Sequence, residues 1–452
     1  MSKKYDYDVI YIGAGVGSVN GAVPLANRGY KVAIVESQAI GGTCPNWGCT
    51  AKYTLDAPAQ LAYRANQFSH IYGGNILHVN WKRDMARKHR NIDSGPATGM
   101  EHRIKAAGIK TYMTHGTLLD NHTVKVDDQK ITADKLVLVP GMTPHHLNVP
   151  GTELTHDSRN FLSLDDLPKR MVVIGTGYVG IELATIANAG GADVTVMMHH
   201  DRPLRGFYEP FADQLVKSLE KQGMHFVKSA KVAGFKKSGN HLVVEYGDHQ
   251  ELATDYVLDA SGRVPNLKHL GLENTNVKYN RHGIEVNGYM QTSVPNVYAT
   301  GDAIDSKIEK LSPTATYETK YLTRLLTGET NKPMAMPAVP TAVYSSPRIA
   351  KVGVDVDQAK AGNQKHPGNF KIVTKDLRNH MWYKATGQTH VAARALVFNR
   401  FNRLVGAEEI SGRADDAISM LAILISLHAT NEQIENMVRL FPSQASDLLS
   451  DF

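Results

Sequence analysis

The pattern of apolar and polar residues predicts that the chain begins with a strand, a helix and a second strand. Residues 8–12 and 31–35 are short apolar runs of the kind that forms buried strands, and the segment between them, up to about residue 28, has the length of a helix. The same order returns at residues 171–198, where two apolar runs flank the helical segment 181–189. Two β-α-β units in one chain predict an α/β protein with two Rossmann-like domains.

A glycine-rich loop connects the first strand to the first helix. Gly13 allows a tight turn, and Gly15 lets a pyrophosphate approach the backbone at the helix N-terminus, where free N–H groups bind anions. Ser18 stands where the third glycine of such a fingerprint usually stands, and a residue of this size still permits close packing of the helix on the strand. Glu36 follows the second strand, at the position of an acid that binds a ribose diol. The first unit is therefore predicted to bind a dinucleotide.

The second unit carries a complete glycine fingerprint, because residues 175–180 read Gly-Thr-Gly-Tyr-Val-Gly. An NADH site places an acid at the tip of the following strand, whereas the 2′-phosphate of NADPH needs cations there. Here no acid ends the strand, and His199, His200 and Arg205 follow it. This pattern favours NADPH and leaves NADH open, since the same residues are also compatible with an ordinary charged surface.

Further apolar runs at 258–260 and 297–300 predict two more strands, and Asp302 follows the second. Because ligands of α/β sheets bind at the carboxyl ends of strands, Asp302 is placed to bond a polyol or ribityl chain, although Gly-Asp alone usually marks a turn. The part from residue 341 onward alternates strand-like runs with a final pair of helices. Segment 417–427 is apolar around much of its circumference, so a subunit interface and a buried core helix both remain open.

The composition indicates an ordinary globular protein of two or three domains. Of the 452 residues, 42% are hydrophobic and 21% charged. The net charge of +6 is a weak bias, and no run of five or more Lys or Arg indicates nucleic-acid binding. The polar N-terminus predicts no secretory signal, and the most apolar helical segment is far shorter than the roughly 20 residues that span a bilayer. We therefore expect a cytoplasmic protein that binds neither nucleic acid nor a membrane.

The only two cysteines, Cys44 and Cys49, lie five residues apart in the stretch 41–49. Such a pair, with no other thiol in the chain, favours redox chemistry. A helix that begins within the stretch lowers a cysteine pKa from its free value of about 8.5. In a regular helix the two would be too far apart for a disulfide, but Pro45 and Gly48 allow an irregular first turn. Two structural cysteines or half of a metal site are the alternatives, although no second pair completes a zinc site.

Taken together, these motifs resemble the flavoprotein disulfide reductase family, which includes glutathione reductase, dihydrolipoamide dehydrogenase and mercuric reductase. The likeness covers essentially the whole chain and keeps the family's motif order. It rests on Gly13 to Ser18 with Glu36, Gly-Gly-Thr-Cys-x₄-Cys at 41–49, Gly175 to Glu182, Ser261-Gly262-Arg263-x-Pro265-Asn266, Thr300-Gly301-Asp302 and residues 340–353.

The resemblance implies an FAD-binding domain, an NAD(P)H-binding domain and a C-terminal α+β domain that forms a homodimer. It implies the following boundaries: FAD-binding, 1–150 and 269–335; NAD(P)H-binding, 151–268; dimerisation, 336–452. Within that scheme, Cys49 would lie against the flavin and Cys44 would attack the substrate by thiol–disulfide exchange.

The resemblance also implies which residues contact the two cofactors, and it implies no metal. Glu182 matches the family's glutamate near the flavin and the nicotinamide. The other implied contacts are Gly13, Gly15, Ser18, Glu36, Gly42, Thr43, Lys52, Gly116, Gly141, Asp302, Ala303, Gly175, Gly177, Tyr178, Gly180, His199, His200, Arg205 and Gly262.

Three departures from the family pattern bear on function. The lysine that pairs with the family's glutamate falls on Tyr53, with Lys52 one residue early. Residues 139–141 read Val-Pro-Gly in place of Ala-Thr-Gly. Most consequential is the C-terminal His-Pro-x-x-x-Glu, where Phe441 replaces the histidine and Ser446 the glutamate. That histidine protonates the leaving thiolate, a role worth roughly 10²–10⁴-fold in rate.

The leading hypothesis is a homodimeric, FAD-containing and NADPH-dependent oxidoreductase that cycles the Cys44–Cys49 disulfide and reduces a small, glutathione-like or other disulfide. The first alternative keeps the flavin and passes electrons to a quinone, a metal ion or oxygen. The second is a flavin-binding redox sensor with little turnover, which the missing histidine and lysine suggest.

Overall fold

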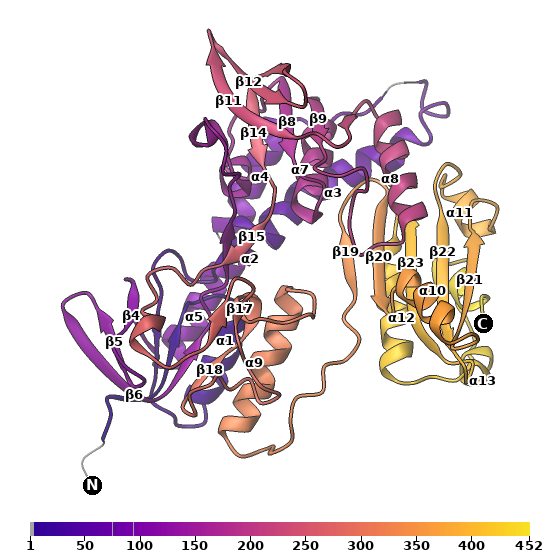
Figure 1. The fold of residues 1–452 in the computed structure, drawn as a ribbon. Helices are drawn as coiled ribbons and strands as arrows, with labels where there is room; N and C mark the ends of the chain where they lie inside the picture. Colours follow the sequence, from indigo (N-terminus) through magenta and orange to yellow (C-terminus); the bar gives the residue numbers. More distant parts are fainter. Residues whose placement is uncertain (1–3, 75, 94) are drawn as a thin grey trace. The chain divides into compact units, whose positions relative to one another are not determined.

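Figure 1 shows the computed structural model, which describes residues 4–74, 76–93 and 95–452. The chain forms two compact units, and each is assembled from three separate segments. The first unit comprises the chain up to Lys52, Ala86–His145 and Arg263–Met336, and the second comprises Tyr53–Met85, His146–Gly262 and Pro337–Phe452.

The first unit is built on a seven-stranded sheet with the order β3-β2-β1-β6-β5-β4, in which β18 also pairs with β6. The pairs among β1, β2, β3, β6 and β18 are parallel, whereas β4, β5 and the start of β6 are antiparallel. Ile12 is in register with both Val35 and Leu138, so three strands end together beside the first glycine loop. The bounds are β1 Tyr7–Ile12, β2 Val32–Val35, β3 Lys110–Tyr112, β4 Gly116–Leu118, β5 Thr123–Val126, β6 Gln129–Leu138 and β18 Val297–Ala299.

Helix α1 (Val16–Ala26) packs closely on α9 (Ser312–Leu326) because small residues lie at their contact (Figure 1). A Cβ on Gly21 would lie only 2.2 Å from the hydroxyl oxygen of Thr319. The sheet and these helices enclose one apolar core. The other elements here are α2 Thr43–Trp47, α5 Pro96–Ala106, β7 Met142–Pro144, β15 Arg263–Pro265, η2 Leu272–Asn274, β16 Tyr279–Asn280, β17 Gly283–Ile284 and η3 Gly301–Ala303, while α3 (Cys49–Asn66) and α4 (Trp81–Asp93) continue from one unit into the other.

The second unit begins with a four-stranded parallel sheet of order β10-β9-β8-β14, which carries the second glycine loop. An antiparallel three-stranded sheet, β11-β12-β13, shares an apolar cluster with it. The bounds are η1 Thr152–Leu154, α6 Ser158–Phe161, β8 Arg170–Ile174, α7 Tyr178–Ala189, β9 Asp193–Met197, α8 Glu209–Lys221, β10 His225–Val227, β11 Val232–Ser238, β12 His241–Tyr246, β13 Gln250–Thr254 and β14 Tyr256–Asp259.

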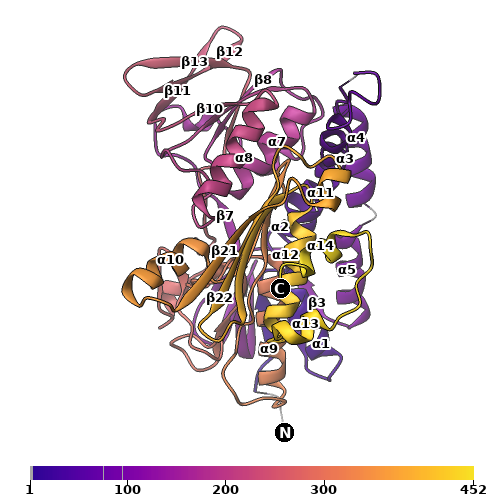
Figure 2. The same cartoon turned by 90° about the vertical axis from the view of Figure 1, so that its right-hand side faces the viewer.

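The C-terminal part of the second unit is a five-stranded antiparallel sheet of order β19-β20-β23-β22-β21. Helix α10 lies on one face of this sheet, and α12 lies on the other (Figure 2). The bounds are β19 Thr341–Val343, β20 Arg348–Gly353, α10 Val356–Lys365, β21 Phe370–Asp376, α11 Met381–Ala385, β22 Ala393–Asn399, β23 Leu404–Ser411, α12 Ala414–Ser426, α13 Asn431–Glu435 and α14 Gln444–Leu449.

The segment 417–427 lies in and just after α12, and the expectation of a core helix is met for one face of it. Ile418 and Leu421 are buried against the sheet, whereas Ile423 and Leu427 are 59% and 72% exposed. The helix therefore contributes to the core with one face and leaves an apolar face uncovered in the single chain.

Candidate active site

The cysteine stretch folds as two helices with a break between them. Gly42, with φ of +63°, precedes the five-residue helix α2, and Gly48 separates α2 from α3. Cys44 consequently lies in the first turn of α2, and Cys49 is the first residue of α3. Helix α3 begins at Cys49, so the second thiol occupies the N-terminal end of a long helix. The Pro45–Gly48 irregularity brings the two side chains together.

The two thiols are free in the structure and have opposite pKa shifts. A hydrogen bond from Cys44 lowers the pKa of Cys49 to about 6, with further lowering from Ser312 and from the charge of Lys52, against an opposing effect of burial. The same hydrogen bond, together with burial, raises the pKa of the Cys44 thiol. The Cys49 sulfur lies 3.5 Å from the Ser312 hydroxyl oxygen at the start of α9. Near neutral pH the pair therefore consists of a Cys49 thiolate and a Cys44 thiol.

Ser312 is a site residue that the sequence analysis did not single out. Its only signal in the sequence is that it precedes Pro313, because proline is favoured in the first turn of a helix. Lys52, in contrast, was predicted to contact a cofactor, and its charge acts on Cys49. Tyr53, the alternative to Lys52, places its ring edge-on against Tyr344 with centroids 5.6 Å apart.

The first glycine loop has the shape of a pyrophosphate cradle. Gly13 has φ of +103°, and a Cβ there would lie 2.2 Å from the Val139 carbonyl oxygen, so only glycine fits the turn. A Cβ on Gly15 would meet nothing closer than 4.0 Å, which leaves its backbone open at the N-terminus of α1. Ser18 is fully buried where the helix meets the sheet. These are the requirements of a dinucleotide, and the residues present fit FAD.

Glu36 and the cysteine stretch both attach to this loop. The Glu36 carboxylate accepts hydrogen bonds from the backbone N–H groups of Ala14 and Gln38, at 2.8 and 2.7 Å. Gly41 donates its N–H to the Ala14 carbonyl at 2.8 Å, and a Cβ on Gly42 would lie 2.9 Å from the Gly15 Cα. The cysteine stretch is thereby held directly beside the predicted pyrophosphate position.

Asp302 lies in η3, beside the N-terminal half of α9. Burial raises its pKa, against the opposing charges of Arg263 and Lys310. The neighbouring Gly301 donates its N–H to the carboxylate of Glu318 at 2.6 Å, and burial raises the pKa of Glu318 to about 7. The acidic group predicted to bond a ribityl chain is thus partly enclosed and flanked by two cations.

Gly116, Gly141 and Ala303 were also predicted to contact a cofactor, and the structure shows how each is placed in the fold. A Cβ on Gly116 would lie 2.9 Å from the Val35 side chain, so β4 packs tightly there. Gly141 has φ of +68° and accepts a hydrogen bond from the Asn266 N–H at 2.9 Å. Ala303 is fully buried. Their roles toward a cofactor stay predictions.

The second glycine loop has the same backbone geometry as the first. Gly175 has φ of +104°, and a Cβ there would lie 2.6 Å from the Ala260 carbonyl oxygen. Gly177 is open, with nothing within 4 Å, and a Cβ on Gly180 would lie 2.2 Å from the Gly175 carbonyl oxygen. Each glycine therefore serves one requirement: the turn, the ligand's approach and the close packing of α7. The loop fits a second pyrophosphate.

The basic residues that follow β9 differ in their contacts. His199, His200 and Arg205 are exposed after β9. Desolvation, and then the charges of Arg205 and His199, lower the pKa of His200. Arg202, which belongs to the same cluster in the sequence, pairs with Asp357 at 2.8 Å and donates to a backbone carbonyl.

Glu182 is buried in α7 and accepts the Tyr344 backbone N–H at 2.9 Å. Around Tyr344, Arg348 lies 4.7 Å from its ring centroid and pairs with Asp56 at 2.8 Å. Arg348 also pairs with Asp415. An arginine–tyrosine cluster therefore surrounds the backbone group that Glu182 binds, a feature that no sequence motif indicated.

The C-terminal segment carries no acid–base pair at the family's two positions. The Phe441 ring is 71% exposed and has no titratable group. The Ser446 N–H is bonded to the hydroxyl of Ser443, which caps α14. Gln444 is buried and donates to the Arg413 carbonyl at 3.2 Å.

The structure combines two thiols of opposite pKa shift, two dinucleotide loops and an antiparallel C-terminal domain. This combination is typical of a class of nicotinamide-dependent flavin enzymes that exchange electrons with sulfur. The chain belongs to the pyridine nucleotide-disulphide oxidoreductase family, whose profile matches residues 7–319, while the profile of that family's dimerisation domain matches residues 339–450. It is therefore an oxidoreductase acting on sulfur groups, and the family's cofactors are a flavin and a nicotinamide nucleotide.

Similar proteins agree with this assignment. The chain is 29% identical to a glutathione reductase of Nostoc sp. over 99% of both sequences. It is also 29% identical to a chloroplastic/mitochondrial glutathione reductase of Pisum sativum, covering 99% of this chain and 83% of that protein. The fold matches that of the HOCl-induced flavoprotein disulfide reductase RclA from Escherichia coli, with a TM-score of 0.88, 23% identity and coverage of 98% and 99%. Within the described part of the chain, no helix is both long and apolar enough to cross a membrane.

Proposed function

We propose that this protein is an NADPH-dependent FAD enzyme that reduces a small disulfide through Cys44 and Cys49. The observation that carries the proposal is the pKa difference between the two thiols, with Cys49 lowered to about 6 and Cys44 raised. A stable thiolate suits the sulfur that faces a flavin. Cys44 holds the shared proton and becomes the attacking thiolate only when that proton moves to Cys49 through their hydrogen bond. Either shift alone would not distinguish the two roles.

The chain's own residues supply the exchange chemistry. FAD, when bound, carries two electrons from the nicotinamide to the disulfide. In the reduced pair, the Cys44 sulfur attacks the substrate disulfide while Cys49 accepts the Cys44 proton through their hydrogen bond. One substrate thiolate leaves and takes that proton. The Cys49 thiolate then attacks the Cys44 sulfur, which releases the second thiolate to solvent protonation and restores the Cys44–Cys49 disulfide.

In this proposal the first glycine loop and Glu36 hold the FAD pyrophosphate and ribose, and Asp302 bonds the ribityl chain. Residues 175–180 hold the NADPH pyrophosphate. The exposed guanidinium of Arg205 binds the 2′-phosphate, and the exposed imidazoles of His199 and His200 donate hydrogen bonds to it. The proposed domains are FAD-binding, 1–150 and 269–335; NADPH-binding, 151–268; dimerisation, 336–452.

The substrate is proposed to be a small disulfide whose thiols leave readily. The relatives named glutathione reductase suggest a glutathione-like molecule. Phe441, however, cannot protonate a leaving thiolate, so disulfides whose thiols have low pKa values should react best.

The uncovered face of α12 supports a homodimer through the C-terminal domain. Ile423 and Leu427 are exposed on or next to this helix, and Val438, Leu440 and Phe441 are exposed further along the chain. An apolar surface of this kind on a dimerisation domain is typical of a subunit interface.

Phe441 also favours a second candidate, in which electrons leave for a quinone, a metal ion or oxygen and the disulfide is auxiliary. Cys44→Ser and Cys49→Ser variants separate the two candidates. Loss of turnover with every acceptor in both variants supports the disulfide reductase. Quinone reduction that survives in both supports the second candidate.

Anaerobic titration with NADPH, and in parallel with NADH, tests the leading proposal. We expect the wild-type protein to develop a long-wavelength thiolate–flavin absorption band after two electrons from NADPH. Cys44→Ser cannot form the disulfide, so it should show this band before any NADPH is added, and Cys49→Ser should not show the band at all. A band that requires Cys44 instead would reverse the two roles. Equal reduction by NADH would contradict the nucleotide preference, and a colourless protein that does not take up FAD would contradict the whole proposal.

A further inference from the structure

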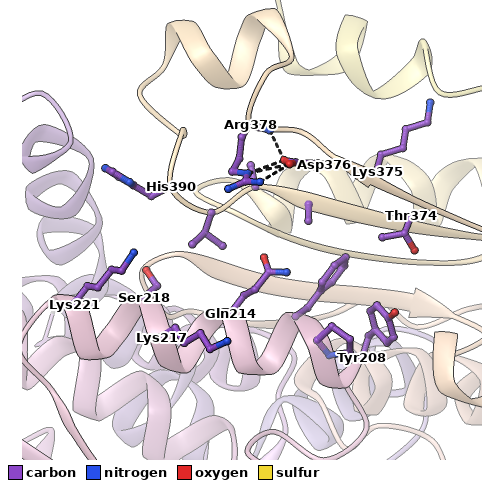
Figure 3. Close-up of a pocket in the computed structure, with 15 residues that line it drawn as sticks. Tyr208, Gln214, Lys217, Ser218, Lys221, Thr374, Lys375, Asp376, Arg378 and His390 are labelled. Atoms are coloured by element: carbon purple, nitrogen blue, oxygen red, sulfur yellow. Dashed lines mark hydrogen bonds and ion pairs between the residues drawn. The ribbon is translucent and has the colours of Figure 1, made fainter.

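The second unit contains a cavity of about 380 Å³ between helix α8 and the strands β21 and β22 (Figure 3). No lining residue belongs to either glycine loop, to the cysteine stretch or to the group of His199, His200 and Arg205 after β9. The lining residues are Tyr208, Pro210, Phe211, Gln214, Lys217, Ser218, Lys221, Thr374, Lys375, Asp376, Arg378, His390, Val391, Ala392 and Ala393.

Helix α8 contributes uncompensated positive charge to this cavity. Lys217 and Lys221 stand four residues apart and therefore lie on the same side of the helix. Neither forms an ion pair with any residue that the structure describes. Two like charges at this spacing repel each other, so an anion between or beside them would be stabilised.

The opposite wall is close to electrically neutral. Arg378 is held by Asp376 through contacts of 2.6 to 3.1 Å, which Figure 3 shows as dashed lines. Lys375 pairs with Asp451 at 2.7 Å. The excess charge of the cavity therefore comes from the two α8 lysines.

Neutral donors complete a site for oxygen atoms. Gln214 projects from α8 into the space between the two walls (Figure 3). The Tyr208 hydroxyl accepts a hydrogen bond from Lys360 at 2.8 Å, which leaves its own proton available for a ligand. Phe211, Ala392 and Ala393 supply a buried apolar floor. Concave sites with a few convergent polar groups over apolar walls are typical of small-ligand pockets.

Both walls are fixed by regular structure. Strand β21 pairs with β22 along its whole length, and the backbone N–H just before α8, at Tyr208, donates to the buried Glu408 of β23 at 2.6 Å. A preformed site loses less conformational entropy when it binds a ligand.

We propose that this cavity binds a compact polyanion, a small molecule with two or more phosphate or carboxylate groups. The lysine pair would bind the anionic groups, and Gln214 and Tyr208 would donate to the remaining oxygens. The site is separate from the proposed cofactor and disulfide chemistry, and its test does not depend on turnover.

Calorimetric titration of the FAD-loaded protein with pyrophosphate and, separately, with citrate tests the proposal at constant ionic strength. Binding of pyrophosphate identifies a phosphate ligand, and binding of citrate identifies a carboxylate ligand. We expect at least one to bind and to raise the melting temperature, because a ligand of the folded state stabilises it. Failure of both probes to bind at millimolar concentration overturns the proposal.

Three variants locate the binding. The double variant Lys217→Gln/Lys221→Gln should weaken binding by about tenfold or more, since each lysine supplies a charge-assisted contact. Lys237→Gln, an exposed lysine on β11, controls for net charge and should leave binding unchanged. Arg205→Gln controls for binding at the nucleotide site. Unchanged affinity in the double variant, or loss of binding in Arg205→Gln, overturns the proposal.

Discussion

A single hydrogen bond between the two sulfurs explains why the pKa values of Cys44 and Cys49 move apart. The proton stays on Cys44, and the negative charge on Cys49 receives support from Ser312 and Lys52. The pair titrates as a coupled system, so its members are best distinguished by substitution.

Replacing Cys44 with Ala should return the Cys49 pKa from about 6 toward the ordinary range of about 8.5, because the donor is removed. The measurement is the pH dependence of alkylation of the reduced protein by iodoacetamide. With Cys44 present, the Cys49 thiolate is lost as pH falls through about 6; in the variant it should be lost near pH 8. Ser312→Ala should produce a smaller rise, and no change in the Cys44→Ala profile would contradict the assigned hydrogen bond.

Phe441 should limit the reduction of disulfides whose thiols are poor leaving groups. Phe441→His should raise kcat for such a substrate by about tenfold or more and show a new dependence on pH near 6.5, the ordinary histidine pKa. Leu440→His, at the exposed neighbouring position, is the matched control and should have no such effect. An identical rise in kcat in both variants would show that the effect does not depend on a histidine at position 441.

At the scale of elements, helix α9 joins the thiolate to the proposed flavin site. Its first residue, Ser312, lies beside Cys49, and its buried Glu318 holds the backbone of Gly301. A carboxyl group with a folded pKa of about 7 binds a proton that the unfolded chain has already lost above about pH 4.3.

The free energy of unfolding should therefore fall as pH rises from about 4.5 to 7, because over this range the folded protein keeps Glu318 protonated while the unfolded chain has lost that proton. Glu318→Gln should flatten this part of the pH profile of the melting temperature while it retains a hydrogen-bond acceptor for Gly301. Glu329→Gln, an exposed position after the same helix, is the control. An unchanged slope in Glu318→Gln would show that Glu318 is ionised throughout.

The loop between β9 and α8 should decide the nucleotide. Arg205→Gln should raise the KM for NADPH by about tenfold and leave that for NADH unchanged, because only NADPH has the 2′-phosphate. Steady-state kinetics with both nucleotides measure this, and Lys237→Gln, an exposed lysine on β11, controls for net charge. Equal effects on both nucleotides would contradict a phosphate contact.

At the scale of the whole molecule, the exposed apolar residues of the dimerisation domain should hold two chains together. Leu427→Glu/Val438→Glu should shift the protein from dimer to monomer in light scattering after gel filtration, because buried charges would be unpaired. Met113→Glu, at a 57% exposed position after β3, should remain dimeric. A wild-type monomer, or a dimeric double variant, would contradict the proposed interface.

The sequence determined the features that are local or periodic. Gly13 and Gly175 could be assigned because no other residue tolerates their backbone angles so close to a carbonyl, and the cysteine spacing indicated redox chemistry because no third thiol exists. The family and its α/β fold followed from the order of such motifs.

Only the tertiary structure decided which distant side chains meet. Ser312 reaches Cys49, Arg348 reaches Asp56, and Lys217 shares a cavity with His390, although each pair is far apart along the chain. Such pairs leave no periodic pattern in the sequence, because their proximity depends on how strands and helices pack. Electrostatic shifts, including the low Cys49 pKa, depend on the same distances and on burial, so they too come from the folded chain alone.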